Sequence, residues 1–145
     1  MGTRLVSEKS ETDIRFLTKK WINGEFGSFI YNKCLDFAIR ITKLYIFLTE
    51  EKKENVLSKQ ILRSGTSIGA NLAEAQYGTS KKDFLAKAYI SLRETAETMY
   101  WLEILKRSNY LTEEQYSSIY KDCEELKKLF MSITKKTKES LTPNS

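Results

Sequence analysis

The chain has 145 residues, of which 41% are hydrophobic, enough for one continuous core but few for two independent domains. It contains no histidine, which removes the commonest general base and metal ligand, and no apolar run of about eighteen residues that could span a membrane. The formal charge of +5 and the pI near 9.1 are compatible with a polyanionic partner. A soluble, cytoplasmic, single-domain protein is therefore expected.

Residues 1–28 are predicted to form an N-terminal extension. Residues 12–21 carry Ile14, Leu17 and Trp21 on one side of a short amphipathic turn, which is too short to be stable unless it docks. This segment is either a natural arm or a leader added to the natural protein, since residues 25–28 resemble a cloning junction.

The first two predicted helices follow this extension. Apolar residues at alternating spacings of four and three predict a helix over residues 29–49, with the seam Ile30, Cys34, Phe37, Ile41, Leu44 and Leu48. After a polar connection at residues 50–54, a second helix is marked by Leu57, Ile61, Gly65, Ile68, Leu72 and Ala75. Gly78 is expected to end it as a left-handed cap.

The third and fourth predicted helices have clear start signals. Ser80 and Asp83 predict an N-cap for a helix with the inward stripe Leu85, Ala88, Leu92, Thr95, Met99 and Leu102. Asn109 is expected to cap its end. Thr112 and Gln115 predict a capping box, with Leu111 packing on Tyr116. The fourth seam comprises Tyr116, Ile119, Cys123, Leu126, Phe130 and Ile133, and its helix is expected to reach about Lys138.

Four helices, three short connections and no strand pattern predict an all-α, antiparallel up-down-up-down four-helix bundle over residues 29–139. Residues 140–145, which contain the single proline, are expected to be a disordered tail.

No catalytic, cofactor or metal site is expected. Cys34 and Cys123 fall within apolar stripes and are interpreted as reduced packing residues. Glu94 and Glu97 lack the Glu-x-x-His elements of diiron bundles, because the chain has no histidine. The protein is therefore predicted not to be an enzyme.

The second helix carries the most informative motif. Gly65, Gly69 and Ala73 recur every four residues and allow a second backbone to approach closely, either for packing or, less favoured, for a ligand. Arg63, Asn71 and Glu74 are spaced so that they can exchange hydrogen bonds in a structural network.

At this motif the sequence resembles the bacterial four-helix-bundle proteins encoded in intervening sequences of large-subunit ribosomal RNA genes. The resemblance covers about residues 29–138 and is carried by Leu62-Arg63, Ser67-Ile68, Asn71, Ala73-Glu74, Ser80-Lys81-Lys82-Asp83-Phe84 and Tyr110-Leu111-Thr112. The fold also looks like that of the accessory protein of diversity-generating retroelements, a basic pentameric barrel. The resemblance implies a homopentameric ring and, for the retroelement relative, binding to nucleic acid and a reverse transcriptase.

Two surfaces are predicted from the remaining residues. An extra apolar set on the third helix, Ile90, Tyr100, Trp101 and Ile104, indicates an oligomer interface. Basic residues predict a nucleic-acid-binding surface for structured RNA or an RNA–DNA hybrid: Arg40, Lys43, Lys106, Arg107, Lys121, Lys127, Lys128, Lys135, Lys136 and Lys138. The alternative is a self-assembling scaffold without nucleic-acid affinity.

Overall fold

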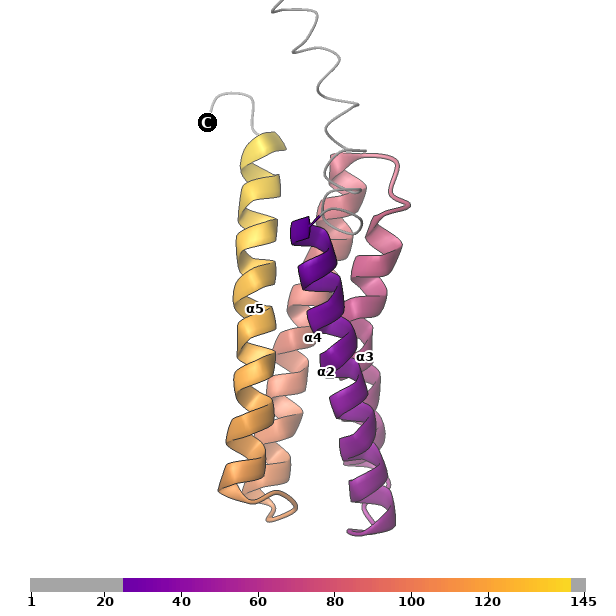
Figure 1. The fold of residues 1–145 in the computed structure, drawn as a ribbon, viewed down its shortest axis with the longest axis vertical. Helices are drawn as coiled ribbons and strands as arrows, with labels where there is room; N and C mark the ends of the chain where they lie inside the picture. The colour runs from indigo at the N-terminus through magenta and orange to yellow at the C-terminus, as the bar shows by residue number, and fades with distance from the viewer. Residues whose placement is uncertain (1–24, 142–145) are drawn as a thin grey trace, which may run out of the picture.

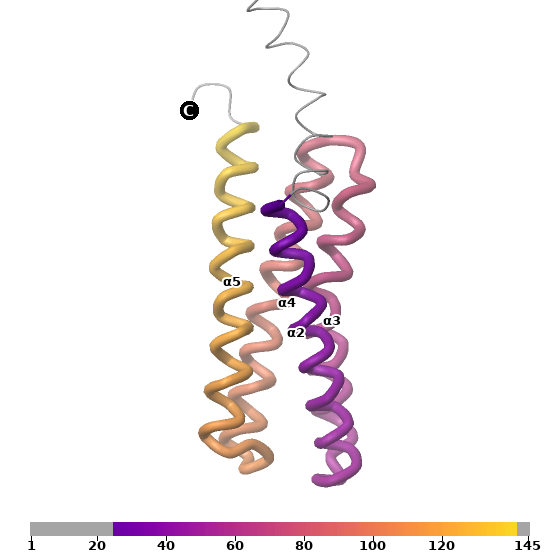
Figure 2. The backbone as a smooth tube through the Cα atoms, viewed as in Figure 1, coloured from indigo at the N-terminus to yellow at the C-terminus, as the bar shows by residue number. Residues whose placement is uncertain are grey.

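A computed structural model describes residues 25–141 and contains, within them, four α-helices and no strand. The helices are α2 (Glu25–Glu50), α3 (Leu57–Ala75), α4 (Lys81–Arg107) and α5 (Glu113–Leu141). Figures 1 and 2 show them side by side along the long axis of the molecule. α2 and α4 each pack on both α3 and α5, so α2 and α4 occupy diagonal positions. The predicted all-α fold of four helices is confirmed.

The helix ends differ from the sequence expectation at two places. α2 begins at Glu25, four residues before the expected start, so the suspected junction at residues 25–28 is helical, and Gly27 is buried. α5 continues to Leu141. The predicted turn at residues 12–21 lies outside the described residues, as do residues 142–145. No helix within residues 25–141 combines the length and apolar character that crossing a membrane requires.

The core follows the predicted seams of α2 and α5. All six seam residues of each of these helices are buried, as are Ile61, Ile68 and Leu72 of α3. Their three- and four-residue spacing places them on one side of each helix, where burial removes apolar surface from water. The hydrophobic pattern alone therefore determined which faces of α2 and α5 point inward.

The predicted inward stripe of α4 is partly wrong. Leu85, Leu92 and Met99 are only half-buried, whereas Phe84, Ser91, Thr98 and Leu105 are buried together with the three predicted residues Ala88, Thr95 and Leu102. The buried face of α4 is rotated relative to the predicted stripe because small polar residues of α4 pack against α3. Ser91 Oγ donates to the carbonyl of Ile68 at 2.8 Å, and Thr98 Oγ1 donates to Ser64 Oγ at 2.9 Å.

The predicted caps of α4 and α5 are confirmed. Ser80 Oγ accepts a hydrogen bond from the Asp83 amide at 3.1 Å. Thr112 Oγ1 accepts one from the Gln115 amide at 3.1 Å, and Gln115 Oε1 accepts one from the Thr112 amide at 2.9 Å. Asn109 adopts a left-handed conformation with φ of 65° at the end of α4. These contacts satisfy amides that a helix start leaves unpaired.

The expected left-handed cap at Gly78 is wrong. No glycine in the described part of the chain has a positive φ. The Gly78 amide donates to the Ala75 carbonyl at 3.1 Å, and a Cβ there would lie 3.2 Å from both that carbonyl oxygen and Asp83 Cβ. A Cβ would therefore be crowded at Gly78, whereas the backbone conformation there does not require glycine.

Gly65 and Gly69 confirm the packing interpretation of the small-residue stripe. A Cβ on Gly65 would lie 2.9 Å from two side-chain carbons of Ile41, and one on Gly69 would lie 2.9 Å from Cys34 Cβ. The glycines thus let α3 approach α2 within the same chain, and this close packing offsets their low helix propensity.

Candidate nucleic-acid interface

Two of the predicted basic residues lie on α2. Arg40 donates from Nη1 to Asp122 Oδ2 at 2.7 Å and to the Ser118 carbonyl at 3.1 Å, and from Nη2 to Ser118 Oγ at 2.5 Å. The guanidinium therefore joins α2 to α5. Lys43 is exposed and has no ion pair among the described residues.

Lys106 and Arg107, at the end of α4, are also engaged within the bundle. Lys106 Nζ lies 3.0 Å from Glu113 Oε2 and 4.6 Å from the centre of the Tyr116 ring. The hydrogen bond from Lys106 holds the pKa of Glu113 below its ordinary value. Arg107 lies 3.5 Å from Glu103, one turn earlier. Both basic residues suit the negative end of the α4 dipole, so their positions have a structural explanation.

The second half of α5 has a different character. Between residues 126 and 138 it contains five lysines and no acidic residue. These lysines are Lys127, Lys128, Lys135, Lys136 and Lys138. Lys128, Lys135 and Lys136 are exposed, and none of the three has an ion pair within residues 25–141. Lys121, in the first half of α5, is exposed among acidic neighbours.

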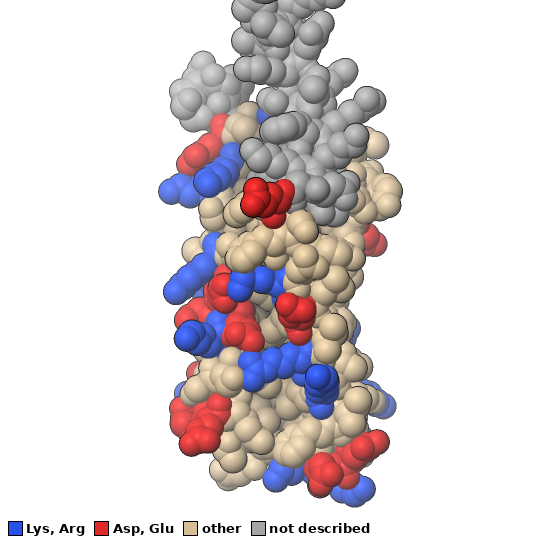
Figure 3. All heavy atoms as spheres, viewed as in Figure 1, with Lys and Arg blue, Asp and Glu red and all other residues tan. Residues whose placement is uncertain are grey.

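Figure 3 shows how these charges are distributed. Blue and red side chains alternate where α2 and α5 meet, in agreement with the Arg40–Asp122 pair and the Lys33–Glu125 pair at 2.5 Å. Blue side chains protrude along the upper and middle parts of the α5 edge, and a red group lies near its lower end. The predicted basic residues are thus interrupted by carboxylates on this side of the molecule, and Lys128, Lys135 and Lys136 are the exposed lysines of α5 beyond them that have no ion pair within residues 25–141.

The predicted network among Arg63, Asn71 and Glu74 is wrong. Arg63 instead reaches across to α4, where it pairs with Glu97 and lies 3.5 Å from Glu94. These two carboxylates raise the pKa of Arg63 despite the opposing effect of desolvation. The sequence spacing missed this arrangement because the partners are more than thirty residues away.

The other motif residues make local contacts. Ser67 Oγ donates to the Arg63 carbonyl at 2.6 Å, and Asn71 Nδ2 donates to the Ser67 carbonyl at 2.8 Å. Glu74 pairs with Lys87 of α4 at 3.2 Å. The motif therefore joins α3 to α4.

The predicted oligomer interface on α4 partly contacts the carboxylates that pair with Arg63. Trp101 Nε1 donates to Glu97 Oε2 at 3.1 Å, and its ring lies edge-on to Tyr100 at 5.2 Å. Ile90, Trp101 and Ile104 are half-buried, and only Tyr100, with 61% exposure, is prominently exposed.

Sequence reasoning missed a second apolar seam on α2. Leu35, Ile39 and Ile46 are 43%, 53% and 47% exposed. Their spacings of four and seven residues place them on one stripe, parallel to the buried seam. That spacing could have predicted the second stripe from the sequence, but it is overlooked when each helix is assumed to have one apolar seam.

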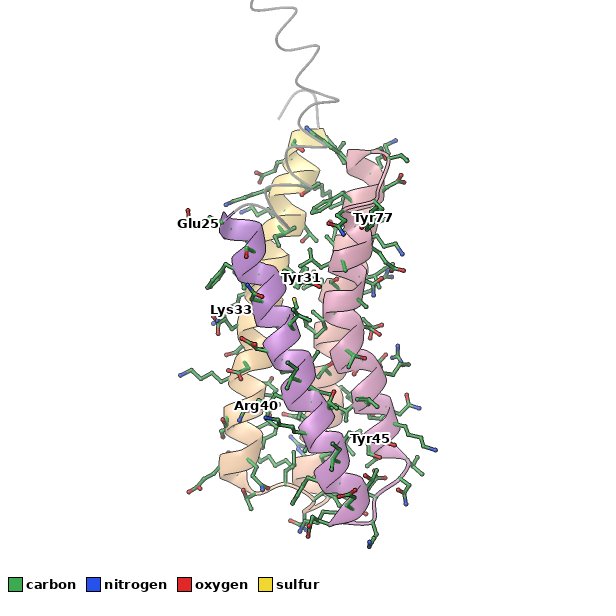
Figure 4. All side chains as sticks on the ribbon, turned by 45° about the vertical axis from the view of Figure 1, so that its right-hand side comes forward. Glu25, Tyr31, Lys33, Arg40, Tyr45 and Tyr77 are labelled. Carbon is green, nitrogen blue, oxygen red and sulfur yellow. The ribbon has the colours of Figure 1, made fainter. Side chains whose placement is uncertain are left out.

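This stripe belongs to an uncharged face over α2 and α3. The charged residues in the middle of α2, Lys33, Asp36, Arg40 and Lys43, follow another stripe, on the α5 side. Figure 4 shows Lys33 and Arg40 on one side of α2, and Tyr31, Tyr45 and the α3 residue Tyr77 on the other. We call Tyr31, Leu35, Ile39, Tyr45, Ile46, Ala70 and Tyr77 the uncharged face.

Both cysteines are free and buried, as the packing interpretation predicts. Burial raises the pKa of each thiol to about 12. The Cys123 thiol donates to the Thr95 carbonyl at 3.4 Å. Among residues 25–141, no group of three or more cysteine, aspartate or glutamate side chains is placed to hold a metal ion.

Comparison with known proteins adds two findings. The model of the family described as "23S rRNA-intervening sequence protein" matches residues 28–132. A crystal structure from Bacteroides thetaiotaomicron VPI-5482, a protein of unknown function from the S23 ribosomal protein family, is 55% identical, with a TM-score of 0.73 over 74% of this chain and 96% of that chain. No curated protein matches the sequence.

Proposed function

Since this chain belongs to the 23S rRNA-intervening sequence protein family, we propose that it is a non-enzymatic, self-associating protein that binds structured RNA or an RNA–DNA hybrid. The observation that carries the proposal is the acid-free stretch of α5 from residue 126 to 138, in which Lys128, Lys135 and Lys136 are exposed and have no ion pair within residues 25–141. Such lysines attract phosphates and release their counterions, which favours binding to any nucleic-acid backbone.

The mode of binding follows from the residue types. Lysine contacts phosphate as a point charge and reads no base by itself. The one aromatic residue between residues 126 and 138, Phe130, is buried, so no aromatic ring on which an unpaired base could stack is exposed among these lysines. Recognition is therefore by charge and shape.

The side chains of this protein also favour a binding role over a catalytic one. It has no histidine to act as a general base, and the two thiols are buried with pKa values near 12, so neither is a thiolate at neutral pH.

Self-association is the second part of the proposal. The resemblance implies up-down-up-down bundles in a homopentameric ring, and the uncharged face supplies a surface that would gain from burial. Its exposed apolar residues and the exposed Tyr100 on α4 support contacts with other copies in the cytoplasm. A reverse-transcriptase partner stays a prediction of the retroelement resemblance.

A scaffold without nucleic-acid affinity is the second candidate. The observation in its favour is that Arg40, Lys106 and Arg107 are already paired with carboxylates of the same chain. The exposed lysines of α5 are then the residues whose replacement distinguishes the two candidate functions.

The test is affinity for a structured RNA across a salt series. The variant Lys128→Gln, Lys135→Gln and Lys136→Gln is compared with Lys52→Gln, Lys53→Gln and Lys59→Gln, which removes the same charge near the α2–α3 connection. We expect the first variant to flatten the slope of log affinity against log salt by about 2 to 3 units, at roughly 0.9 per lost phosphate contact. The second should leave it unchanged. Absence of binding by the parent protein at about 100 mM salt would establish the scaffold instead.

A further inference from the structure

Charge is segregated along the hairpin of α4 and α5. Three contacts fix how the two helices align: Lys106 with Glu113, Tyr116 with Glu103 at 3.5 Å, and the Cys123 thiol with Thr95. In each pair the residue numbers add to nearly the same value, so the helices are antiparallel. Residues 84–93 of α4 therefore lie opposite residues 126–135 of α5.

The two halves of this hairpin have opposite compositions. The half away from the α4–α5 connection, residues 81–93 and 126–138, contains nine basic residues and one acidic residue, Asp83. The half beside the connection, residues 94–107 and 113–125, contains eight acidic and three basic residues. We call the first the basic half and the second the acidic half.

Several charges of the basic half share its outward surface. Cys123 and Phe130 are buried, so Lys128 and Lys135, which lie on the opposite side of the helical period, point outward. Lys127 borders them on the α4 side and is half-buried. Lys136 lies two heptads beyond Asp122, which faces α2, and so falls on a different side of α5.

On the neighbouring helix α4, Arg93 also points away from the core. Arg93 is exposed, has no ion pair within the described residues, and is flanked by the buried Ser91 and Thr95. Lys82, three turns earlier at the start of α4, is likewise exposed and unpaired within residues 25–141. Of the other two basic residues in this part of α4, Lys81 is half-buried and Lys87 is paired with Glu74 of α3.

We infer that Lys82 and Arg93 of α4, together with Lys127, Lys128 and Lys135 of α5, bind the phosphate backbone of a double-helical nucleic acid. This inference rests on the proposed function and restricts nucleic-acid binding to the basic half of the α4–α5 hairpin. From residue 82 to 93 the surface is about 17 Å long, at about 1.5 Å per residue, and two helices wide. The one aromatic residue between Lys82 and Arg93 on this stripe, Tyr89, is half-buried. A broad surface of point charges with no fully exposed aromatic side chain between them suits a duplex, whose bases are stacked inside, better than a single strand.

The acidic half limits where the duplex lies. Glu114 and Glu124, which have no ion pair within the described residues, would repel phosphates along the first half of α5. The duplex backbone is therefore held at the end of the bundle where α4 starts and α5 ends, the upper end in Figure 1.

The test uses the full chain, a 20-base-pair RNA duplex and a single strand of the same length. The variant Lys82→Gln and Arg93→Gln is compared with Arg107→Gln and Lys121→Gln, a control that removes two charges from the acidic half. We expect the first variant to bind the duplex at least about tenfold more weakly and to reduce the salt slope by about two units, and the control to match the parent. Circular dichroism checks that both variants keep their helices.

Four outcomes would overturn the inference. Equal weakening by both variants would mean that only total charge matters. Preference of the parent for the single strand would exclude the duplex but leave the proposed function standing, whereas failure of the parent to bind either RNA would remove both. A change in sedimentation of the Lys82→Gln, Arg93→Gln variant without a change in RNA affinity would assign the surface to a second copy of the chain.

Discussion

Glu54 lies between α2 and α3, where its carboxylate accepts hydrogen bonds from the amides of Val56, Leu57 and Ser58 at 2.7–3.0 Å. Val56 occupies the N-cap position of α3 but has no side-chain oxygen with which to cap it. Glu54 takes over this task and, as an anion, also complements the positive end of the helix dipole. Burial alone would raise its pKa, but the amides of Leu57, Ser58 and Val56 outweigh burial and hold the pKa below its ordinary value of 4.5.

Replacing Glu54 by alanine should lower the free energy of unfolding by about 1 to 2 kcal/mol, the usual cost of a lost cap. Because the folded pKa is depressed, the stabilisation is complete above pH 4.5 and is lost as the pH falls through the folded pKa. Urea unfolding at several pH values measures both effects. Glu51→Ala, at an exposed glutamate nearby, is the control and should change little. A stability difference that persisted undiminished in strong acid would contradict the role of the charge.

At the scale of helices, the close approach of α2 and α3 depends on Gly65. Gly65→Ala would place a Cβ 2.9 Å from two carbons of the buried, branched Ile41. We expect it to lower the free energy of unfolding by about 1 to 2 kcal/mol, because overpacking outweighs the gain in helix propensity. In an Ile41→Ala background the same change should become neutral or stabilising. Thermal unfolding of the four proteins of this double-mutant cycle measures the coupling, and additive effects would show that the two residues are independent.

Hydropathy determined which buried helix faces could be predicted and which could not. The seams of α2 and α5 were correct because large apolar residues recur on one side of each helix. The face of α4 was misjudged because Ser91 and Thr98 carry no hydrophobic signal, and their burial depends on partners in α3. The predicted nucleic-acid-binding surface included too many basic residues for a similar reason. Arg40 is neutralised by Asp122, which lies 82 positions away in the sequence, and no local sequence pattern indicates that pair.

At the scale of the molecule, two sides with opposite chemistry face away from each other. The uncharged face covers α2 and α3, whereas the segregated charges lie over α4 and α5, and α2 is diagonal to α4. A contact between copies that buries the uncharged face need not cover the basic half. Self-association and nucleic-acid binding are therefore compatible in this bundle, and in a ring the basic halves of all copies would lie toward the same rim.

The uncharged face can be tested without disturbing the core, since Ile39 is 53% exposed. Ile39→Lys should shift the protein from oligomer to monomer in sedimentation experiments, because an unpaired lysine in an apolar contact must be desolvated at a cost of several kcal/mol. Val56→Lys is a matched control, because Val56 is 71% exposed but lies in the α2–α3 connection. It should leave the oligomer intact. If both variants sedimented like an oligomeric parent, the contact would lie elsewhere, with Tyr100 on α4 the next residue to change, whereas a monomeric parent would refute self-association itself.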